Sequence, residues 1–246
     1  MTGGCVYVNR LCAWAPGIES SSDWDEWAAG KRAISVGRGP DIAFTEPMFR
    51  RRLSRISRMT IQVIHDLMPL AQDTKVFFIS FRGELSRQFQ INKMLLEEKE
   101  LSPAAFSLSV FNAPAALASM ALSLKGGYSA LYPGNNSFAA GLKAAVAALL
   151  CGAPKELCLV YADEEVQGEY LGLCRDAPAP TLASMPMLTS AAFGLLLSRS
   201  PEGSGVLLPA PDEEDTPKDS PLDSPKDSPL DFLRRLLLRG EIHVSP

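Results

Sequence analysis

Residues 112–152 read NAPAALASMALSLKGGYSALYPGNNSFAAGLKAAVAALLCG, and this stretch decides the fold. Its pattern predicts an alanine-rich helix up to the glycine pair at 126–127 and a strand at 128–132. The turn PGNNS then leads at residue 137 into a second alanine-rich helix, which Gly152 ends. Such a turn holds a side chain at a helix N-terminus, where backbone N–H groups and the helix dipole stabilise an anion. An enzyme that uses a nucleophile would carry its Cys or Ser at this turn.

Strands and helices alternate on both sides of this stretch. Apolar runs predict strands at residues 5–13, 75–80, 156–161 and 188–198, and a short extended piece at 107–110. The length of the run at 188–198 also permits a helix. Helices are predicted at residues 23–29, 47–70 and 84–100, and a loop at 30–46. This alternation predicts an α/β fold: a mostly parallel five-stranded sheet with helices on both faces.

The composition changes after residue 200. Proline becomes frequent, and PKDSPLDS at 217–224 is followed by PKDSPLD at 225–231. This composition has too little apolar surface to offset chain entropy, so residues 201–230 are predicted to form a linker after a domain of residues 1–200. Residues 231–246 begin with DFLRRLLLR, an amphipathic helix that either packs back on the domain or docks on a partner. Deletion of residues 201–246 is expected to change the melting temperature by only a few degrees.

Composition excludes several classes of function. The formal net charge of -4 argues against general nucleic-acid binding. The cysteines show no CxxC spacing and His65 lies far from His243, so we expect no metal site, and no cofactor. The N-terminus lacks the pattern of a signal peptide, and the most apolar run, residues 139–151, is too short to span a bilayer. We therefore expect a cytoplasmic protein without membrane insertion.

The chain from about residue 4 to residue 165 resembles the N-terminal half of the β-ketoacyl synthases, condensing enzymes with a thiolase fold. LKGG at 124–127 falls on the family's L-x-G-P, and CG at 151–152 falls on the glycine that ends the nucleophile helix. The closer resemblance is to a shorter subgroup, the chain length factor-like homologues of aryl polyene biosynthesis. Four segments carry it: AWAPG at 13–17, RRRLSRISRM at 50–59, SFRGEL at 80–85 and LSPAAFSLSVFN at 101–112.

Departures from the family pattern imply a subunit without catalysis of its own. The family's active-site cysteine falls on Asn135, and neither histidine of this chain matches the pair that the family carries in its C-terminal half. The resemblance thus implies a chain length factor-like subunit that pairs with a full-length β-ketoacyl-ACP synthase, with acyl carrier protein as a transient partner. Two other functions stay open, namely decarboxylation of malonyl thioester through Asn135 and a stand-alone acyl-binding module.

The turn itself allows two interpretations. Asn135, Asn136 and Ser137 suit a helix cap, because their side chains accept hydrogen bonds from N–H groups of a first turn. The alternative is a pseudo-active site in which the Asn135 amide contacts a carbonyl group. Ser137 could act as a nucleophile only beside a base, and the sequence offers no candidate base.

The resemblance also implies a dimer contact. In the family, the strand before the nucleophile turn pairs antiparallel across the dimer, and this strand falls on Tyr128, Ser129, Ala130 and Leu131. An uncovered strand edge would otherwise invite aggregation. A proline at Ser129 or Leu131 should impair association if the N–H it removes faces the partner.

Two further groups of residues are candidates for function. The family's loop at residues 80–85 lies at the partner's acyl channel, which implies that Phe81 or Arg82 limits chain length. Spacings of three and four place Arg51, Arg55 and Arg58 near one face of the predicted helix. These arginines form either a docking patch for an acidic carrier protein or a solvated, ion-paired face.

Overall fold

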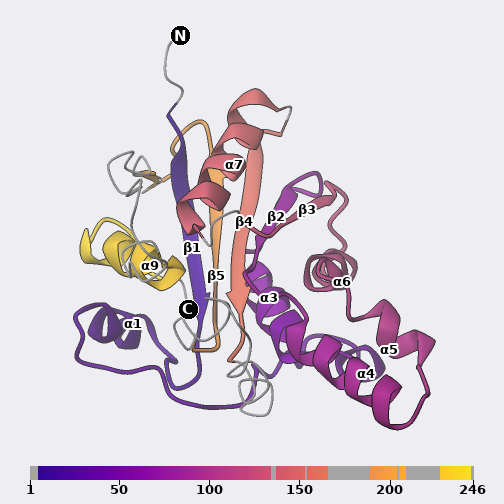
Figure 1. Cartoon of the computed structure of the whole chain (residues 1–246). Helices are drawn as coiled ribbons and strands as arrows, with labels where there is room; N and C mark the ends of the chain where they lie inside the picture. The colour runs from indigo at the N-terminus through magenta and orange to yellow at the C-terminus, as the bar shows by residue number, and fades with distance from the viewer. Residues whose placement is uncertain are drawn as a thin grey trace, which may run out of the picture.

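The computed structural model describes residues 5–133, 137–152, 154–165, 189–203, 205–208 and 228–244. One six-stranded sheet has the strand order β3-β2-β4-β5-β1-β6 (Figure 1). The strands are β1 (Tyr7–Trp14), β2 (Lys75–Ile79), β3 (Tyr128–Leu131), β4 (Glu156–Asp163), β5 (Ala191–Ser198) and β6 (Val206–Leu207). The helices are α1 (Ser21–Ala28), α2 (Pro47–Arg50), α3 (Arg55–Asp66), α4 (Leu85–Glu97), α5 (Pro103–Ser107), α6 (Ala113–Ala121), α7 (Phe138–Cys151) and α9 (Pro229–Leu238).

The sheet is mixed. Strand β2 pairs parallel with β3 and β4, whereas β5 pairs antiparallel with β4 and β1, and β6 pairs antiparallel with β1. The α/β class is confirmed, but the prediction of a mostly parallel sheet of five strands is wrong. A strand that is buried on both faces is apolar throughout in either direction, and the two residues of β6 are too few to form an apolar run.

Helices cover both faces of the sheet. Alternate side chains of β4 point to opposite faces, as the pleat requires. Leu157, Leu159 and Tyr161 pack in the core beneath α1, α7 and α9, and Cys158 and Val160 pack beneath α3 and α6. Both faces of this strand are therefore inside the protein.

The predicted helix at residues 47–70 is two helices, α2 and α3. Ser54 adopts an extended conformation between them, and its hydroxyl oxygen accepts a hydrogen bond from the Ser57 N–H at 3.2 Å. This cap begins α3 and interrupts the apolar pattern. The extended piece predicted at 107–110 is also wrong, because Ser102 caps α5 and Pro103 occupies its first turn. The other predicted helices and strands overlap the observed ones.

Helix α9 packs on the domain. Phe232, Leu233, Leu236 and Leu237 are buried in the same core as α7. The Arg234 guanidinium lies 4.8 Å from the centre of the Trp27 ring of α1. Of the two interpretations of this helix, the structure thus shows the one in which it packs back on the domain, and deletion of residues 201–246 should lower the melting temperature by more than a few degrees. Residues 209–227 of the predicted linker lie outside the described residues.

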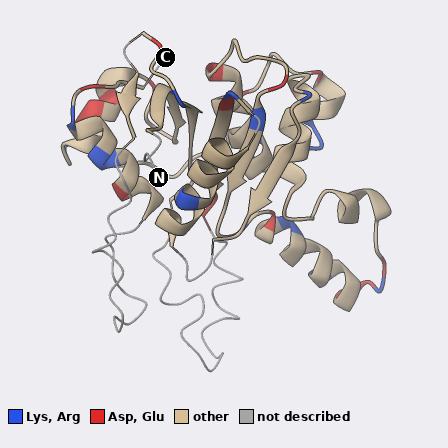
Figure 2. Ribbon diagram, turned by 90° about the horizontal axis from the view of Figure 1, so that it is seen from above, with Lys and Arg blue, Asp and Glu red and all other residues tan. Residues whose placement is uncertain are grey.

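Helices α4 and α5 form a hairpin, which we call the arm (residues 85–107). It extends away from the sheet, and acidic and basic residues gather at its turn (Figure 2). Ile91 is the one residue of α4 that is buried. Most of the surface of α4 is thus uncovered within this chain. In the part of the chain that the structure describes, no helix combines the length and apolar character that a membrane span requires.

Candidate functional site

The carboxyl ends of three neighbouring strands meet at one edge of the sheet, because β2 is parallel to both β3 and β4. Strand β2 leads into the loop at residues 80–84, and β3 leads into the turn before α7. Strand β4 ends at Asp163. In open α/β sheets this carboxyl edge is where functional side chains gather.

Only part of the turn that resembles a nucleophile site lies within the described residues. Ser137 is the N-cap of α7, and its hydroxyl oxygen accepts a hydrogen bond from the Ala140 N–H at 3.2 Å. This contact fits the helix-cap interpretation for Ser137. Asn135 and Asn136 lie outside the described residues.

A buried carboxylate, Asp163, holds the loop after β2. Its two oxygens accept the backbone N–H groups of Phe81 at 2.9 Å and Arg82 at 3.0 Å, and the Ser80 hydroxyl at 2.7 Å. The Ser80 oxygen in turn accepts the Gly83 N–H at 2.7 Å. Burial raises the pKa of the Asp163 carboxyl to about 6, although the hydrogen bonds from Phe81 and Ser80 act to lower it.

Phe81 and Arg82 point into this chain. Each side chain is 9% exposed. The Phe81 ring lies 6.3 Å from the Tyr161 ring, and Arg82 Nη1 donates to the carbonyl oxygen of Glu164 at 3.3 Å. The two residues therefore form the inner wall of the carboxyl edge.

Glu84 is a second buried carboxylate at this edge. Its Oε1 accepts hydrogen bonds from the hydroxyls of Ser54 at 2.6 Å and Ser57 at 2.7 Å. Its Oε2 lies 3.6 Å from Arg87 Nε. Burial raises the pKa of the Glu84 carboxyl, while the two hydroxyls act to lower it. The chain after β2 is thus bound to the start of α3.

Neither Asp163 nor Glu84 is predicted as a site residue from the sequence. A signal for both was present: an acidic residue ends the apolar run of β4, and another follows β2 by five residues. A carboxylate next to a buried strand is costly unless it is hydrogen-bonded, so such a position merits attention. Their partners come from distant parts of the chain, which sequence spacing does not reveal.

The three arginines of the predicted patch are not on one helix. Arg51 follows α2 and is exposed, whereas Arg55 and Arg58 belong to α3 and are half-buried. Arg55 Nη1 donates to the Ser190 hydroxyl at 3.1 Å, and Arg58 Nη2 donates to the carbonyl oxygen of Arg50 at 2.9 Å. The prediction of one shared helix face is wrong, because the Ser54 cap separates Arg51 from the others.

Strand β3 forms an outer edge of the sheet. The carbonyl oxygen of Gly127 accepts a hydrogen bond from the Val76 N–H of β2 at 3.0 Å, and that of Leu131 accepts one at 3.3 Å from the Ser80 N–H directly after β2. Because the backbone groups of a strand alternate in direction, the N–H groups of Ser129 and Leu131 face β2. Those of Tyr128 and Ala130 face the open edge.

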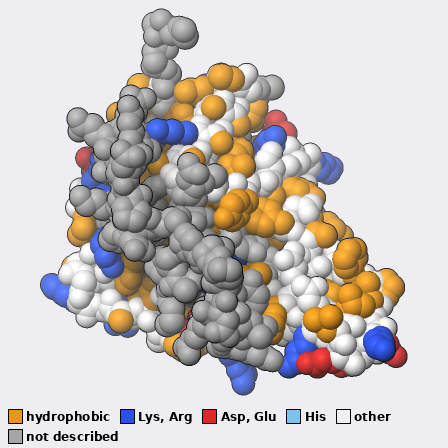
Figure 3. Space-filling model, viewed as in Figure 1, with side chains coloured by type: hydrophobic (Ala, Val, Ile, Leu, Met, Phe, Trp, Pro, Cys, Tyr) orange, Lys and Arg blue, Asp and Glu red, His pale blue; other side chains and the backbone are white. Residues whose placement is uncertain are grey.

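Exposed apolar side chains lie on the same side of the molecule as this edge. Phe106, Val110, Met120, Tyr128 and Tyr132 are between 37% and 71% exposed. Figure 3 shows that orange, hydrophobic side chains gather on this side of the molecule, over α5 and α6. Exposed apolar clusters next to an open strand edge are typical of protein interfaces.

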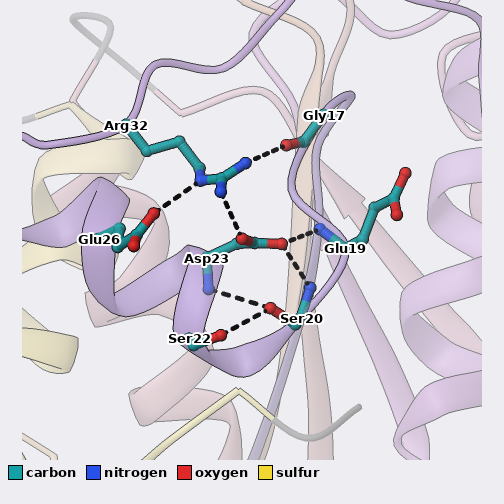
Figure 4. A network of polar contacts seen from close by, with 7 residues as sticks. All are labelled: Gly17, Glu19, Ser20, Ser22, Asp23, Glu26 and Arg32. Carbon is teal, nitrogen blue, oxygen red and sulfur yellow. Dashed lines mark hydrogen bonds and ion pairs between the residues drawn. The ribbon is translucent and has the colours of Figure 1, made fainter.

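A separate polar cluster at α1 maintains local structure. Asp23 accepts the backbone N–H groups of Glu19 and Ser20, both at 3.0 Å, and forms an ion pair with Arg32 at 2.8 Å (Figure 4). Arg32 also pairs with Glu26 at 3.0 Å. These bonds lower the pKa of Asp23, the one from the Glu19 backbone most strongly. The first turn of α1 is therefore capped by side chains at its own N-terminus.

The described residues contain no group of three or more His, Cys, Asp or Glu side chains that suits a metal ion.

Comparison with known proteins identifies the family. Residues 24–241 match the model of the β-ketoacyl synthase N-terminal domain, so the chain belongs to that family. The match extends through α9. The predicted resemblance is thus confirmed. No match was found among curated proteins.

Solved structures agree with this family. One is the ketosynthase ApeO in complex with its chain length factor ApeC from Xenorhabdus doucetiae, with a TM-score of 0.66, 26% identity, and coverage of 80% of this chain and 80% of the matched chain. The ishigamide ketosynthase/chain length factor matches with a TM-score of 0.62 and 14% identity, over 79% of this chain and 62% of the other. The type II polyketide ketosynthase AntDE with its acyl carrier protein AntF matches with a TM-score of 0.59 and 11% identity, over 79% of this chain and 63% of the other. This chain spans less than two thirds of the length of the last two matched chains. At 14% and 11% identity, these two structures show the fold alone.

Proposed function

We propose that this chain is a non-catalytic, chain length factor-like subunit that pairs with a full-length β-ketoacyl-ACP synthase in the cytoplasm. The observation that carries the proposal is the open edge of β3 with its apolar surroundings. The similarity to a complex of a ketosynthase with its chain length factor supports it. Asn135 at the nucleophile position supports the non-catalytic role.

In this proposal Ala130 and Tyr128 supply the backbone groups that pair with the partner's strand. The interface is of the obligate kind and buries more than about 2,000 Å² in total. Phe81 and Arg82 are buried in this chain, and they limit chain length as part of the wall behind the partner's acyl channel. The transient carrier protein contacts the exposed Arg51, because Arg55 and Arg58 are engaged within the chain.

A proline series along β3 tests the proposal. Ala130→Pro removes an N–H that faces the open edge, so this variant should fold but fail to co-purify with the ketosynthase. Ser129→Pro removes an N–H that faces β2 and should lower the stability of the subunit itself. Ala130→Val keeps the N–H and is the matched control. Circular dichroism confirms folding, and a tagged subunit reports association.

Two outcomes would refute the dimer. One is a folded Ala130→Pro variant that recovers the ketosynthase at wild-type yield. The other is a wild-type chain that remains a stable, soluble monomer beside every ketosynthase of its source organism.

A further inference from the structure

The arm is attached to the body mainly at its base. Ile91 is the one buried residue of α4, whereas Leu95 and Leu96 near its far end are 48% and 80% exposed. The 13 residues of α4 make a helix about 20 Å long. A tilt of about 10° at its first turn would therefore move the far end by about 3 Å.

Hydrogen bonds at the base set that tilt. Arg87 Nη2 donates to the carbonyl oxygen of Arg52 at 2.9 Å, and Gln88 Nε2 donates to the carbonyl oxygen of Ser109 at 2.9 Å. One turn earlier, Glu84 holds two hydroxyls at the start of α3. Before that, Asp163 holds three consecutive residues of the preceding loop. The base is therefore fixed by polar contacts to three other parts of the chain.

We propose that Glu84 and Asp163 are positioning residues of the partner interface, which fix the direction in which the arm leaves the body. This inference rests on the proposed function. The arm carries Leu95, Leu96, Leu101 and Phe106 as exposed apolar side chains, and it adjoins the β3 side of the molecule (Figures 1 and 3). A ketosynthase partner that pairs with β3 buries these side chains only if the arm has one direction.

Buried carboxylates suit this task better than apolar side chains. A hydrogen bond weakens steeply when its angle changes, so Glu84 with two hydroxyls allows one geometry, whereas apolar groups pack in several. A buried carboxylate is costly to desolvate, and its partners must remain in place to offset that cost. The result is a rigid base under an exposed helix.

The experiment measures the direction of the arm and the affinity for the partner in the full chain. Spin labels on native Cys151, which is exposed, and on Glu97→Cys at the end of α4 report one distance, with Cys5 and Cys174 changed to Ser. Glu84→Ala removes both hydroxyl contacts. It should broaden the distance distribution and weaken binding to the full-length ketosynthase about tenfold. Glu84→Gln keeps an oxygen that accepts from both hydroxyls, so it should stay within about threefold of the wild type.

Two further variants control for a loss of stability. Ser198→Ala removes a buried hydroxyl that binds Asn9 at the opposite end of the sheet, and it should leave the distance and the affinity unchanged. Ser57→Ala removes one donor to Glu84 and should show a smaller broadening even if Glu84→Ala fails to fold.

The outcomes separate the two proposals. If Glu84→Ala binds the ketosynthase as tightly as the wild type and shows the same distance distribution, the positioning role alone is overturned. A wild-type chain that binds no ketosynthase overturns the proposed function, and the role of the arm in partner binding fails with it.

Discussion

At the scale of single residues, buried acidic side chains hold the carboxyl edge of the sheet together. Asp163 joins β4 to the loop after β2, and Glu84 joins that loop to α3. Gly83 completes the loop with a φ of 54°, and a Cβ at this position would lie 2.6 Å from the Phe111 ring. The geometry of this loop depends on contacts that are distant in sequence.

The pH dependence of stability should report Asp163. Its pKa is raised from 3.8 to about 6 in the folded protein, so the folded state binds the proton more tightly than the unfolded chain. The stabilisation that results is fully present below about pH 4 and is lost as the pH rises through about 6. It amounts to on the order of 3 kcal/mol.

Asp163→Asn removes this titration. The difference in free energy of unfolding between the wild type and this variant should fall between about pH 4 and pH 6, and be constant above that range. Urea unfolding of both proteins across this range measures it. Glu84, Glu164 and Tyr161 remain in both proteins, which limits their effect on the difference. A difference that is flat or rises with pH would contradict the assignment.

At the scale of elements, the tail helix matters most. Phe232 of α9 lies 5.2 Å from the Phe138 ring of α7 and 6.2 Å from the Phe193 ring of β5. Leu233, Leu236 and Leu237 extend the same contact. The helix thus completes the core on the α7 face of the sheet.

Truncation of Phe232 should therefore be severe. Phe232→Ala leaves a cavity beside two rings and should lower the free energy of unfolding by about 3–5 kcal/mol. Leu238→Ala, one turn and a half further along the same helix, changes a side chain that is 62% exposed and should cost less than about 0.5 kcal/mol. Chemical denaturation compares the two. Equal, small losses would show that α9 is not part of the core in solution.

At the scale of the whole molecule, the chain has the fold of the β-ketoacyl synthase N-terminal domain. In the proposed function, Asn135 stands at the position where the family has its active-site cysteine. In that proposal the chain acts through two surface features, the open strand β3 and the exposed arm.

The purified chain alone should release no CO₂ from malonyl carrier protein, and a cysteine-directed ketosynthase inhibitor should label no active-site position. Asn135→Ala is the matched control, and it should behave as the wild type does. Decarboxylation that disappears in Asn135→Ala would instead favour a decarboxylating pseudo-ketosynthase. Measurement of CO₂ release with and without the full-length ketosynthase distinguishes a non-catalytic subunit from a decarboxylating one.

The sequence by itself determined the family, the α/β class and the approximate place of most helices and strands. It did so because these properties depend on local patterns, such as the glycines around residues 126 and 152 and the apolar runs of β2 and β4. The N-cap Ser137 belongs to this group, since a cap forms within four residues.

Only the tertiary structure decided the strand directions, the inward N–H groups of Ser129 and Leu131, and the burial of Phe81, Arg82 and α9. Each of these depends on which segments become neighbours. A backbone N–H of β3 faces inward or outward according to its register with β2, and register has no signature in a short apolar strand. Asp163 and Glu84 became visible as site residues for the same reason, because the groups that donate hydrogen bonds to them lie between 27 and 83 residues away in sequence.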